Sequence, residues 1–401
     1  MPVVHLVALG TRGDVAPAVV VAAQLRARGH EVLVHGADRY AGLAAAESVP
    51  YRAAGDVDLF GSTPTSRRLT LSQAGITYAL LRRRYRAWSA GLWARLRDAD
   101  PRDVLLCGLG SAALASAWRG RGGRAALLLV GDVRPPGPPA PGVSGQNGQP
   151  GQPGRLTVSE RCRRSLMWPL TMQMSAAPGA ARHDVPLPTV LAVSRTLAGG
   201  APLPAHVVRT GHLFGPVPAA AAPQPATPVV YVGLGWLTDP SGRLLHRLAD
   251  AAGAVGCRLV TDAAPLAEID DPPRSVASAD ETDHRRLFGQ VAGVLHHGGA
   301  GTTVTGLLAA RPTAIIPMLG DQFALARRVH DLGAGPRPLH RHVLTDRALR
   351  RTLAALADPP ERFRRAASEL ADALTAEDGV RRTTEACERI IEGGRPACTS
   401  S

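Results

Sequence analysis

The chain has 401 residues, 45% of them hydrophobic, which is enough for two domains with cores of their own. Its net charge is +13, but the basic residues are scattered and only 4% of residues are aromatic, which argues against a nucleic-acid partner. Its five cysteines form no CxxC pair, so they indicate neither a disulfide framework nor a zinc site and are typical of a cytoplasmic protein.

The first 36 residues predict a β-α-β unit. Residues 3–9 are a continuous apolar run, typical of a buried parallel strand, and no basic leader segment precedes them. A tight turn follows at 10–14, Pro17 opens a helix that ends at Gly29, and residues 31–35 form the next strand. This order is typical of an α/β, doubly wound sheet, in which ligands bind at the carboxyl ends of the strands.

Residues 66–97 predict a long helical region, because apolar side chains recur there at helical spacing. Further strands are expected at 104–107 and 125–130, and a last strand of the first domain at 189–193. Between them, residues 134–154 are rich in proline, glycine and glutamine. This segment is either an insertion without a role or a flexible lid.

The second half of the chain repeats the α/β pattern after a Pro/Ala-rich stretch at 213–228, which we interpret as a linker. Strands are predicted at 229–232, 258–261, 291–295 and 313–316, with helices at 242–255, 346–357, 361–376 and 380–391. No apolar run approaches the ~20 residues of a membrane span. The last residues, 393–401, are expected to be disordered.

The stretch from His296 to Gln322, HHGGAGTTVTGLLAARPTAIIPMLGDQ, carries the most specific chemistry. A strand leads into a glycine turn and then into a helix start, where unpaired N–H groups and the helix dipole favour a phosphate. The glycines let the backbone approach an anion closely, and His296 or His297 can add a ring donor. Asp321 and Gln322, after the next strand, offer a carboxylate and an amide to sugar hydroxyls.

This stretch resembles the donor-binding signature of bacterial GT-B glycosyltransferases, the nucleotide-sugar-dependent family that includes antibiotic and sterol glycosyltransferases. It is most similar to the glycopeptide-antibiotic branch. The run Gly10-Thr11-Arg12-Gly13-Asp14 and the run Glu377-Asp378-Gly379-Val380 also resemble family landmarks, so the similarity covers nearly the whole chain.

The resemblance implies two Rossmann-like doubly wound domains facing a cleft. Residues 1–212 would bind the acceptor, 213–228 would link the domains, and 229–376 would bind the nucleotide sugar. Residues 377–401 would return to the first domain as a helix with a disordered tail. The implied reaction is inverting transfer of a sugar from a UDP- or TDP-sugar to a hydroxyl of a small-molecule natural product, in the cytoplasm of a bacterium.

The family places its proposed base at the aspartate of the GxRGD motif, which is Asp14 here. A base at this position would take the proton of the acceptor hydroxyl; the alternative is that Asp14 caps the helix that follows. The resemblance also gives Gly10, Tyr85 and Trp88 as candidates for acceptor contact. For Tyr85 and Trp88 the alternative is packing of a helix on the sheet.

The donor would bind without a metal, because a helix start and a histidine can neutralise a diphosphate and no acidic pair ends a strand. No cofactor is expected, and Asp321 could also cap the helix that follows it. The match to the family favours His296 over His297 as the donor to the diphosphate. The predicted donor residues are His296, Gly299, Ala300, Gly301 and Thr302 for the diphosphate, Asp321 and Gln322 for the sugar, and Thr282 for the base.

One departure from the family pattern is Trp236, which follows Gly233-Leu234-Gly235 where a serine or threonine is usual. Thr238 can substitute for that hydroxyl, or the donor is held differently. Three alternatives therefore stand beside the leading one. They are a non-catalytic binding or partner protein, a nucleotide-sugar epimerase, and a membrane-surface enzyme with a lipid acceptor. The sequence identifies neither the sugar nor the acceptor nor the oligomeric state.

Overall fold

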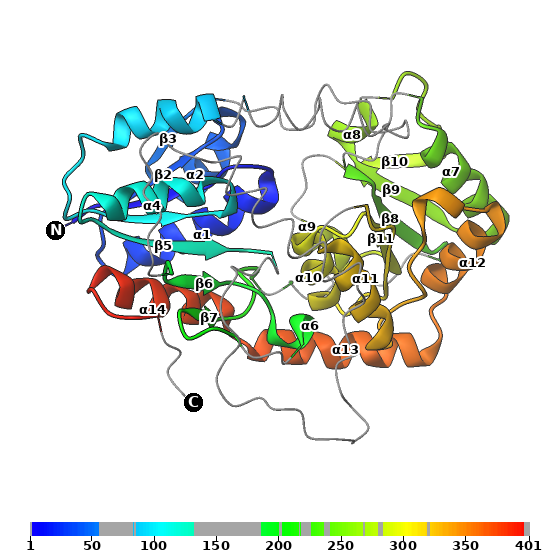
Figure 1. Cartoon of the computed structure of the whole chain (residues 1–401). Helices are drawn as coiled ribbons and strands as arrows, with labels where there is room; N and C mark the ends of the chain where they lie inside the picture. The colour runs from blue at the N-terminus through cyan, green and yellow to red at the C-terminus, as the bar shows by residue number, and fades with distance from the viewer. Residues whose placement is uncertain are drawn as a thin grey trace. The chain divides into compact units, whose positions relative to one another are not determined.

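The computed structural model describes residues 2–55, 83, 86–131, 186–199, 203–215, 217, 226–235, 241–267, 269–279, 284–318 and 321–396. Contacts divide the chain into two units. One contains the described residues up to Leu213 together with those from Glu377 onward, and the other contains Phe214–Ala376. Each unit is built on its own parallel sheet with helices on both faces (Figure 1).

The sheet of the first unit has seven parallel strands in the order β3-β2-β1-β4-β5-β6-β7. β1 lies inside the sheet and is buried along its whole length, as expected of a strand covered on both faces. The strands are β1 (Val4–Val7), β2 (Val32–Gly36), β3 (Tyr51–Ala53), β4 (Val104–Cys107), β5 (Arg124–Leu129), β6 (Thr189–Leu191) and β7 (Val207–Arg209).

Successive side chains of β1 enter two different cores. Val4 and Leu6 pack with α1 and α14 on one face, whereas Val7 packs with residues 86–96 and α4 on the other. The helices of this unit are α1 (Arg12–Ala27), η1 (Asp38–Tyr40), α2 (Ala41–Ala46), the helical residues 86–96, η2 (Leu109–Ser111), α4 (Ala112–Gly120), α6 (Arg195–Ala198) and α14 (Gly379–Ile391).

Two predictions for this unit are wrong. β6 is not the last strand, because β7 follows it and pairs with it in parallel; three residues are too few to give a periodic signal. Helix α1 begins at Arg12 instead of Pro17, so Asp14 lies in its first turn. Pro17 lies inside α1, where it removes one main-chain hydrogen bond near the helix start. Residues 134–154, for which an insertion without a role and a flexible lid are both open, lie outside the described residues.

The sheet of the second unit has five parallel strands in the order β10-β9-β8-β11-β12. The chain runs from β8 outward through β9 to β10 and then returns to the other side of β8. The strand order therefore reverses between β8 and β11, where ligands bind in sheets of this type. The strands are β8 (Val229–Gly233), β9 (Arg258–Asp262), β10 (Val276–Ala279), β11 (Gly293–His296) and β12 (Thr313–Ile315).

Helices pack on both faces of this second sheet. One core joins β8 and β11 to α7 and α12, and a smaller one joins Tyr231, Val294 and Phe288. The helices are α7 (Arg243–Val255), α8 (Ala263–Ala267), α9 (His284–Phe288), α10 (Ala300–Leu308), α11 (Gln322–Asp331), η4 (Arg341–Val343), α12 (Asp346–Ala357) and α13 (Glu361–Ala376).

Helix α14 is an integral part of the first unit. Ala386, Cys387 and Ile390 are buried in the core that α1 and β1 share. At the start of the helix, Glu377 Oε1 accepts hydrogen bonds from Ser194 Oγ at 2.9 Å and from the amide and hydroxyl of Thr196 at 3.0 and 2.9 Å. These contacts tie the residues before α14 to α6 of the same unit.

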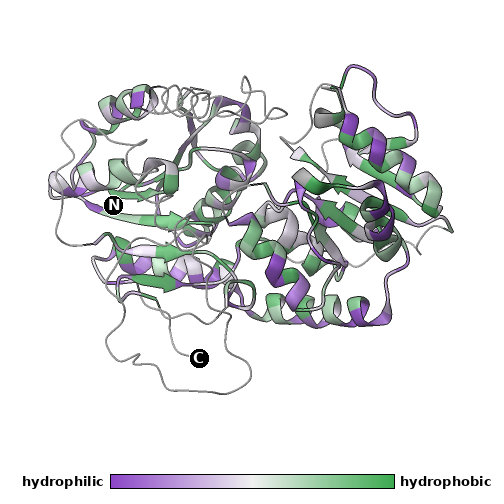
Figure 2. Cartoon of the chain, turned by 45° about the vertical axis from the view of Figure 1, so that its right-hand side comes forward, coloured by the Kyte–Doolittle hydropathy of each residue, from purple (hydrophilic) through white to green (hydrophobic). Residues whose placement is uncertain are grey.

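Hydrophobic residues dominate the strands of both sheets, whereas the outer helices alternate hydrophilic and hydrophobic residues (Figure 2). This alternation agrees with helices that bury one face against a sheet. Within the part of the chain that the structure describes, no helix is both long and apolar enough to cross a bilayer.

Candidate active site

The turn between β11 and α10 has the geometry of an anion site. Gly298 adopts a φ of +97°, a conformation that side chains rarely take, and Gly299 is the N-cap of α10. The first amides of the helix, from Ala300 onward, have no carbonyl one turn earlier to accept them. A Cβ on Gly299 would lie 3.0 Å from His297 Nε2 and 3.9 Å from Thr302 Oγ1, so ring and hydroxyl flank this glycine.

His296 does not have the geometry of the predicted phosphate donor. Its side chain is fully buried, and its Nδ1 accepts the Gly298 amide at 3.0 Å. Its Nε2 lies 3.3 Å from Thr303 Oγ1, which itself donates to the Gly299 carbonyl at 2.9 Å. Burial, and then the neighbouring His297, hold the pKa of His296 well below its usual range, so the ring is neutral. His296 therefore holds the glycine turn from within.

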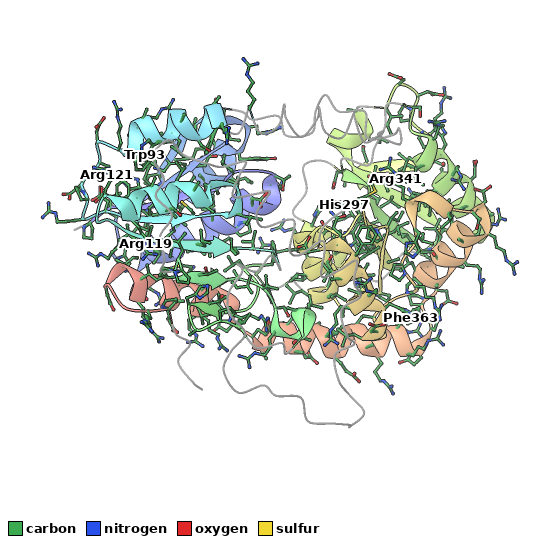
Figure 3. All side chains as sticks on the ribbon, viewed as in Figure 1. Trp93, Arg119, Arg121, His297, Arg341 and Phe363 are labelled. Carbon is green, nitrogen blue, oxygen red and sulfur yellow. The ribbon has the colours of Figure 1, made fainter. Side chains whose placement is uncertain are left out.

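His297, labelled in Figure 3, is the less buried of the two histidines. Its main-chain amide donates to the Gly233 carbonyl at 3.0 Å, and its Nδ1 lies 3.2 Å from the same oxygen. Because a carbonyl only accepts, Nδ1 carries the proton and Nε2 points toward Gly299. Burial lowers the pKa of His297, while the bond to Gly233 and the charge of Asp262 raise it.

The end of β8 forms the opposite side of this turn. Gly235 has a φ of +52°, and a Cβ there would lie 3.0 Å from His297 Cε1. A side chain at this position would therefore press on the histidine ring. Trp236 and Thr238, which the sequence singles out, lie outside the described residues.

Asp321 and Gln322 stand at the start of α11. Gln322 is only 8% exposed, and its Oε1 accepts the Met318 amide at 2.8 Å, so it fixes the loop after β12. Its Cβ also lies against Gly298, where an added Cβ would come within 3.0 Å. Asp321 is the N-cap residue of α11, but its side chain makes no capping hydrogen bond to that helix. Contact of either residue with a sugar stays a prediction.

Asp14 lies at the carboxyl end of β1 in the first unit. Its Oδ2 accepts the Thr11 amide at 2.8 Å and the Thr11 hydroxyl at 3.1 Å. Thr11 is the N-cap of α1 and Asp14 is the third helical residue, so the two form a capping box and Asp14 is not the N-cap that the alternative predicts. Gly10 has a φ of +127°, and a Cβ there would overlap Asp14 Oδ2. The residues of the GxRGD motif thus hold one another in place, and a base role for Asp14 stays a prediction.

The other predicted contacts are only partly described. Trp88 is 8% exposed and packs with Leu92 and Leu96 in the first unit, as the packing alternative predicts. Tyr85 and Thr282 lie outside the described residues. Among the residues that are described, no group of three or more histidine, cysteine or acidic side chains is arranged to hold a metal ion.

A polar cluster that the sequence analysis does not predict lies beside the anion site. Tyr231, Asp262 and His284 are joined by hydrogen bonds at the carboxyl ends of β8 and β9 and the start of α9. In the sequence, the only sign of this cluster is that Asp262 stands at the end of an apolar run. Its partners Tyr231 and His284 are distant along the chain. The parallel pairing of β8 with β9 brings Tyr231 and Asp262 together, and the start of α9 adds His284.

Parts of the chain are similar in sequence to known proteins. Residues 246–391 match the family described as erythromycin biosynthesis protein CIII-like, C-terminal domain. A sterol 3-beta-glucosyltransferase of Arabidopsis thaliana is 37% identical over 129 residues, 32% of this chain and 21% of that protein. The vancomycin aglycone glucosyltransferase of Amycolatopsis orientalis is 35% identical over 153 residues, 36% of this chain and 37% of that protein. The chain thus matches well under half the length of either relative.

Solved structures match nearly the whole chain. The glycotransferase of kitacinnamycin aligns with a TM-score of 0.69 and 19% identity over 98% of this chain and 100% of the other. The glycosyltransferase VinC in complex with dTDP aligns with a TM-score of 0.64 and 20% identity over 98% of this chain and 100% of the other. At such identities the likeness shows the fold.

The chain has the GT-B fold of these glycosyltransferases. Its residues 246–391 are similar to the C-terminal domain of the erythromycin CIII-like family. The resemblance predicted from residues 296–322 and the predicted α/β fold with two parallel sheets are both confirmed.

Proposed function

We propose that the chain is an inverting glycosyltransferase that moves a sugar from a UDP- or TDP-sugar to a hydroxyl of a small-molecule natural product. The observation that carries this proposal is the β11–α10 turn, where helix amides, Thr302 and His297 Nε2 surround Gly299. The amides and the hydroxyl are donors that suit a diphosphate, and His297 Nε2 becomes one when the ring is protonated. VinC, which shares the fold, was solved with dTDP, so TDP is the first nucleotide to test.

Displacement at the anomeric carbon leaves a nucleoside diphosphate with additional negative charge. The helix start of α10 and a protonated His297 would stabilise that charge. In the free protein Nε2 of His297 is an acceptor, because Nδ1 donates to Gly233. A bound diphosphate favours the imidazolium form, so that binding takes up a proton and Nε2 becomes a donor.

The acceptor hydroxyl needs a base, and we assign this role to Asp14. Both Thr11 donors bond to its Oδ2, which orients the carboxylate at the carboxyl end of β1. Helix α1 and Gly10 fix the carboxylate in this orientation. The two roles are compatible, because a carboxylate has two oxygens with several lone pairs.

Two acceptor classes follow from the relatives. The name of one relative states that it glucosylates the vancomycin aglycone, and that of another that it glucosylates sterols. We propose an antibiotic-type aglycone of a bacterial pathway as the acceptor, because the whole-chain fold matches come from antibiotic glycosyltransferases. A sterol-like acceptor is the second candidate.

The test is incubation of the protein with TDP- or UDP-glucose, with and without EDTA, and with peptide, polyketide and sterol acceptors, followed by mass spectrometry. Transfer that persists in EDTA, with the opposite anomeric configuration, supports an inverting, metal-independent enzyme. Isomerised donor without transfer supports an epimerase instead. Donor binding without any turnover across the panel supports a non-catalytic binding protein.

A further inference from the structure

Tyr231, Asp262 and His284 form a hydrogen-bonded group in the second unit. The Tyr231 hydroxyl donates to Asp262 Oδ2 at 2.8 Å, and His284 Nε2 lies 2.8 Å from Asp262 Oδ1. Because a carboxylate only accepts, His284 Nε2 carries the proton in this contact. Burial and the Asp262 charge raise the pKa of Tyr231, so its hydroxyl remains a donor. Both oxygens of Asp262 are thus held in fixed directions.

Packing makes this group rigid. The His284 ring stacks on Phe288 at 5.0 Å with an interplanar angle of 10°, and Tyr231 lies 4.8 Å from the same ring. Phe288 is fully buried, and Arg311 donates to the carbonyls of Phe288 and Gly289 at 3.0 and 2.7 Å. Helix α9 is therefore held at its start by Asp262 and at its end by Arg311.

The group is continuous with the anion site through Gly233. A Cβ on Gly233 would lie 2.8 Å from the Tyr231 hydroxyl, so tyrosine and glycine are in contact. The carbonyl of the same glycine accepts both the amide and Nδ1 of His297. Asp262 thus holds Tyr231, Tyr231 lies against Gly233, and Gly233 orients the ring of His297.

The titratable groups around His297 are a carboxylate and two imidazoles. Asp262 on β9 favours its protonated form. The neighbouring imidazole is His296 on β11, which burial keeps neutral, and His284 on α9 is paired with Asp262 itself. Helix α10 carries no ionisable side chain, and neither does β12. A carboxylate next to a diphosphate site opposes anion binding unless a cation forms between them. His297 is placed to become that cation.

We propose that Asp262 is a positioning residue of the donor site, which fixes the Gly233 carbonyl through Tyr231 and supplies the negative charge beside which His297 is protonated. This inference rests on the proposed function, since it assigns His297 to a diphosphate. Asp262 itself does not touch the ligand. It acts on His297 through the end of β8.

The first test needs no ligand. Protein labelled with 13C at histidine Cε1 is titrated by NMR, and the His297 signal is identified by its absence in His297→Gln. Asp262→Asn keeps the size of the side chain and an acceptor for Tyr231 but removes the charge. We expect this variant to lower the pKa of His297, and the exposed control Asp270→Asn to leave it unchanged. An unchanged pKa in Asp262→Asn, or in Asp262→Ser should the first variant not fold, overturns the proposal.

The second test uses calorimetric titration with TDP and with pyrophosphate between pH 6 and 9. The affinity of the wild-type protein falls as His297 becomes harder to protonate, and we expect Asp262→Asn to move this fall to lower pH for both ligands. Each ligand ionises in the same way with either protein, so a difference between the two pH profiles comes from the protein. A shift with TDP alone means direct contact with the nucleoside and overturns the positioning role. If the wild-type protein binds neither ligand, the proposed function fails, and the NMR titration still decides the role of Asp262.

Discussion

The amide and the hydroxyl of Thr11 both donate to the same oxygen of Asp14, at 2.8 and 3.1 Å. This arrangement orients the carboxylate at the start of α1. A residue that caps a helix and acts as a base would have separable effects on folding and on catalysis. Exchange of either partner of the pair can therefore distinguish the two roles.

Asp14→Asn is expected to lower the transfer rate by roughly 10²–10⁴-fold, because an amide cannot take a proton. Its carbonyl oxygen still accepts from Thr11, so stability should change by no more than about 1 kcal/mol. Donor affinity should be nearly unchanged. Equal losses of transfer and of donor affinity, measured by initial rates and calorimetry, would contradict the base assignment.

Thr11→Ala is the matched control for this pair. It removes the hydroxyl donor but keeps the amide contact and the carboxylate of Asp14. We expect a loss of about 0.5–2 kcal/mol in the free energy of unfolding and a retained transfer activity. A loss of activity as large as that of Asp14→Asn would mean that the cap alone accounts for both results.

The adjacent histidines give a second pair of variants. His297→Gln is expected to weaken TDP binding by about 1.5–3 kcal/mol, roughly a 10- to 150-fold rise in Kd, because a charged donor is lost. His296→Gln should instead destabilise the protein by about 1–3 kcal/mol, since its ring holds Gly298 and Thr303 from within. Calorimetry and thermal unfolding separate these effects, and the reverse pattern would restore the prediction for His296.

Gly299→Ala tests the space in front of the helix. Its φ of −58° suits alanine, but the new Cβ would lie 3.0 Å from His297 Nε2. We expect at least a tenfold weaker affinity for TDP, with a stability loss of no more than about 1 kcal/mol at an N-cap. The control, Gly253→Ala on an exposed turn of α7, meets no atom within 4 Å and should be stabilising by about 0.5–1 kcal/mol. Unchanged affinity in Gly299→Ala would place the ligand elsewhere.

A buried pair of histidines makes stability depend on pH. His5 Nδ1 lies 3.0 Å from His35 Nε2, and burial lowers the pKa of His35 to about 3. In the unfolded chain histidine titrates near ~6.5, so below that pH the unfolded state binds more protons and stability falls as pH decreases. Each such histidine contributes a slope of about 1.4 kcal/mol per pH unit.

His35→Leu is expected to reduce this slope between pH 6 and pH 4 by about one proton, because the leucine side chain does not titrate. The measurement is the free energy of unfolding by urea at several pH values. An unchanged slope would show that His35 is not a neutral, buried group in the folded protein.

Much of the fold follows from sequence pattern. Helices α12 and α13 are observed at the predicted residues, since apolar residues recur there at helical spacing and Thr345 caps the first of them. Strand β4 is likewise predicted at its observed residues because it is apolar throughout and buried on both faces. In contrast, β10 has only one buried residue, Val276, and gives no such pattern.

The site is harder to predict than the fold. The glycine turn is evident from the sequence, but the sequence does not decide between His296 and His297. Which of the two faces the core depends on the pairing of β11 with β8 and β12, which the local sequence does not contain. The contact between Asp262 and His284 joins residues that are 22 positions apart through two elements that meet only in the folded sheet.

The proposed function requires that a nucleoside diphosphate binds at the start of α10 beside His297. Calorimetric titration of the purified protein with TDP and with UDP in the presence of EDTA tests it most directly. We expect one-to-one binding of at least one nucleotide that survives EDTA and is weakened at least tenfold in both His297→Gln and Gly299→Ala. Absence of binding by both nucleotides, or binding that neither variant weakens, would contradict it.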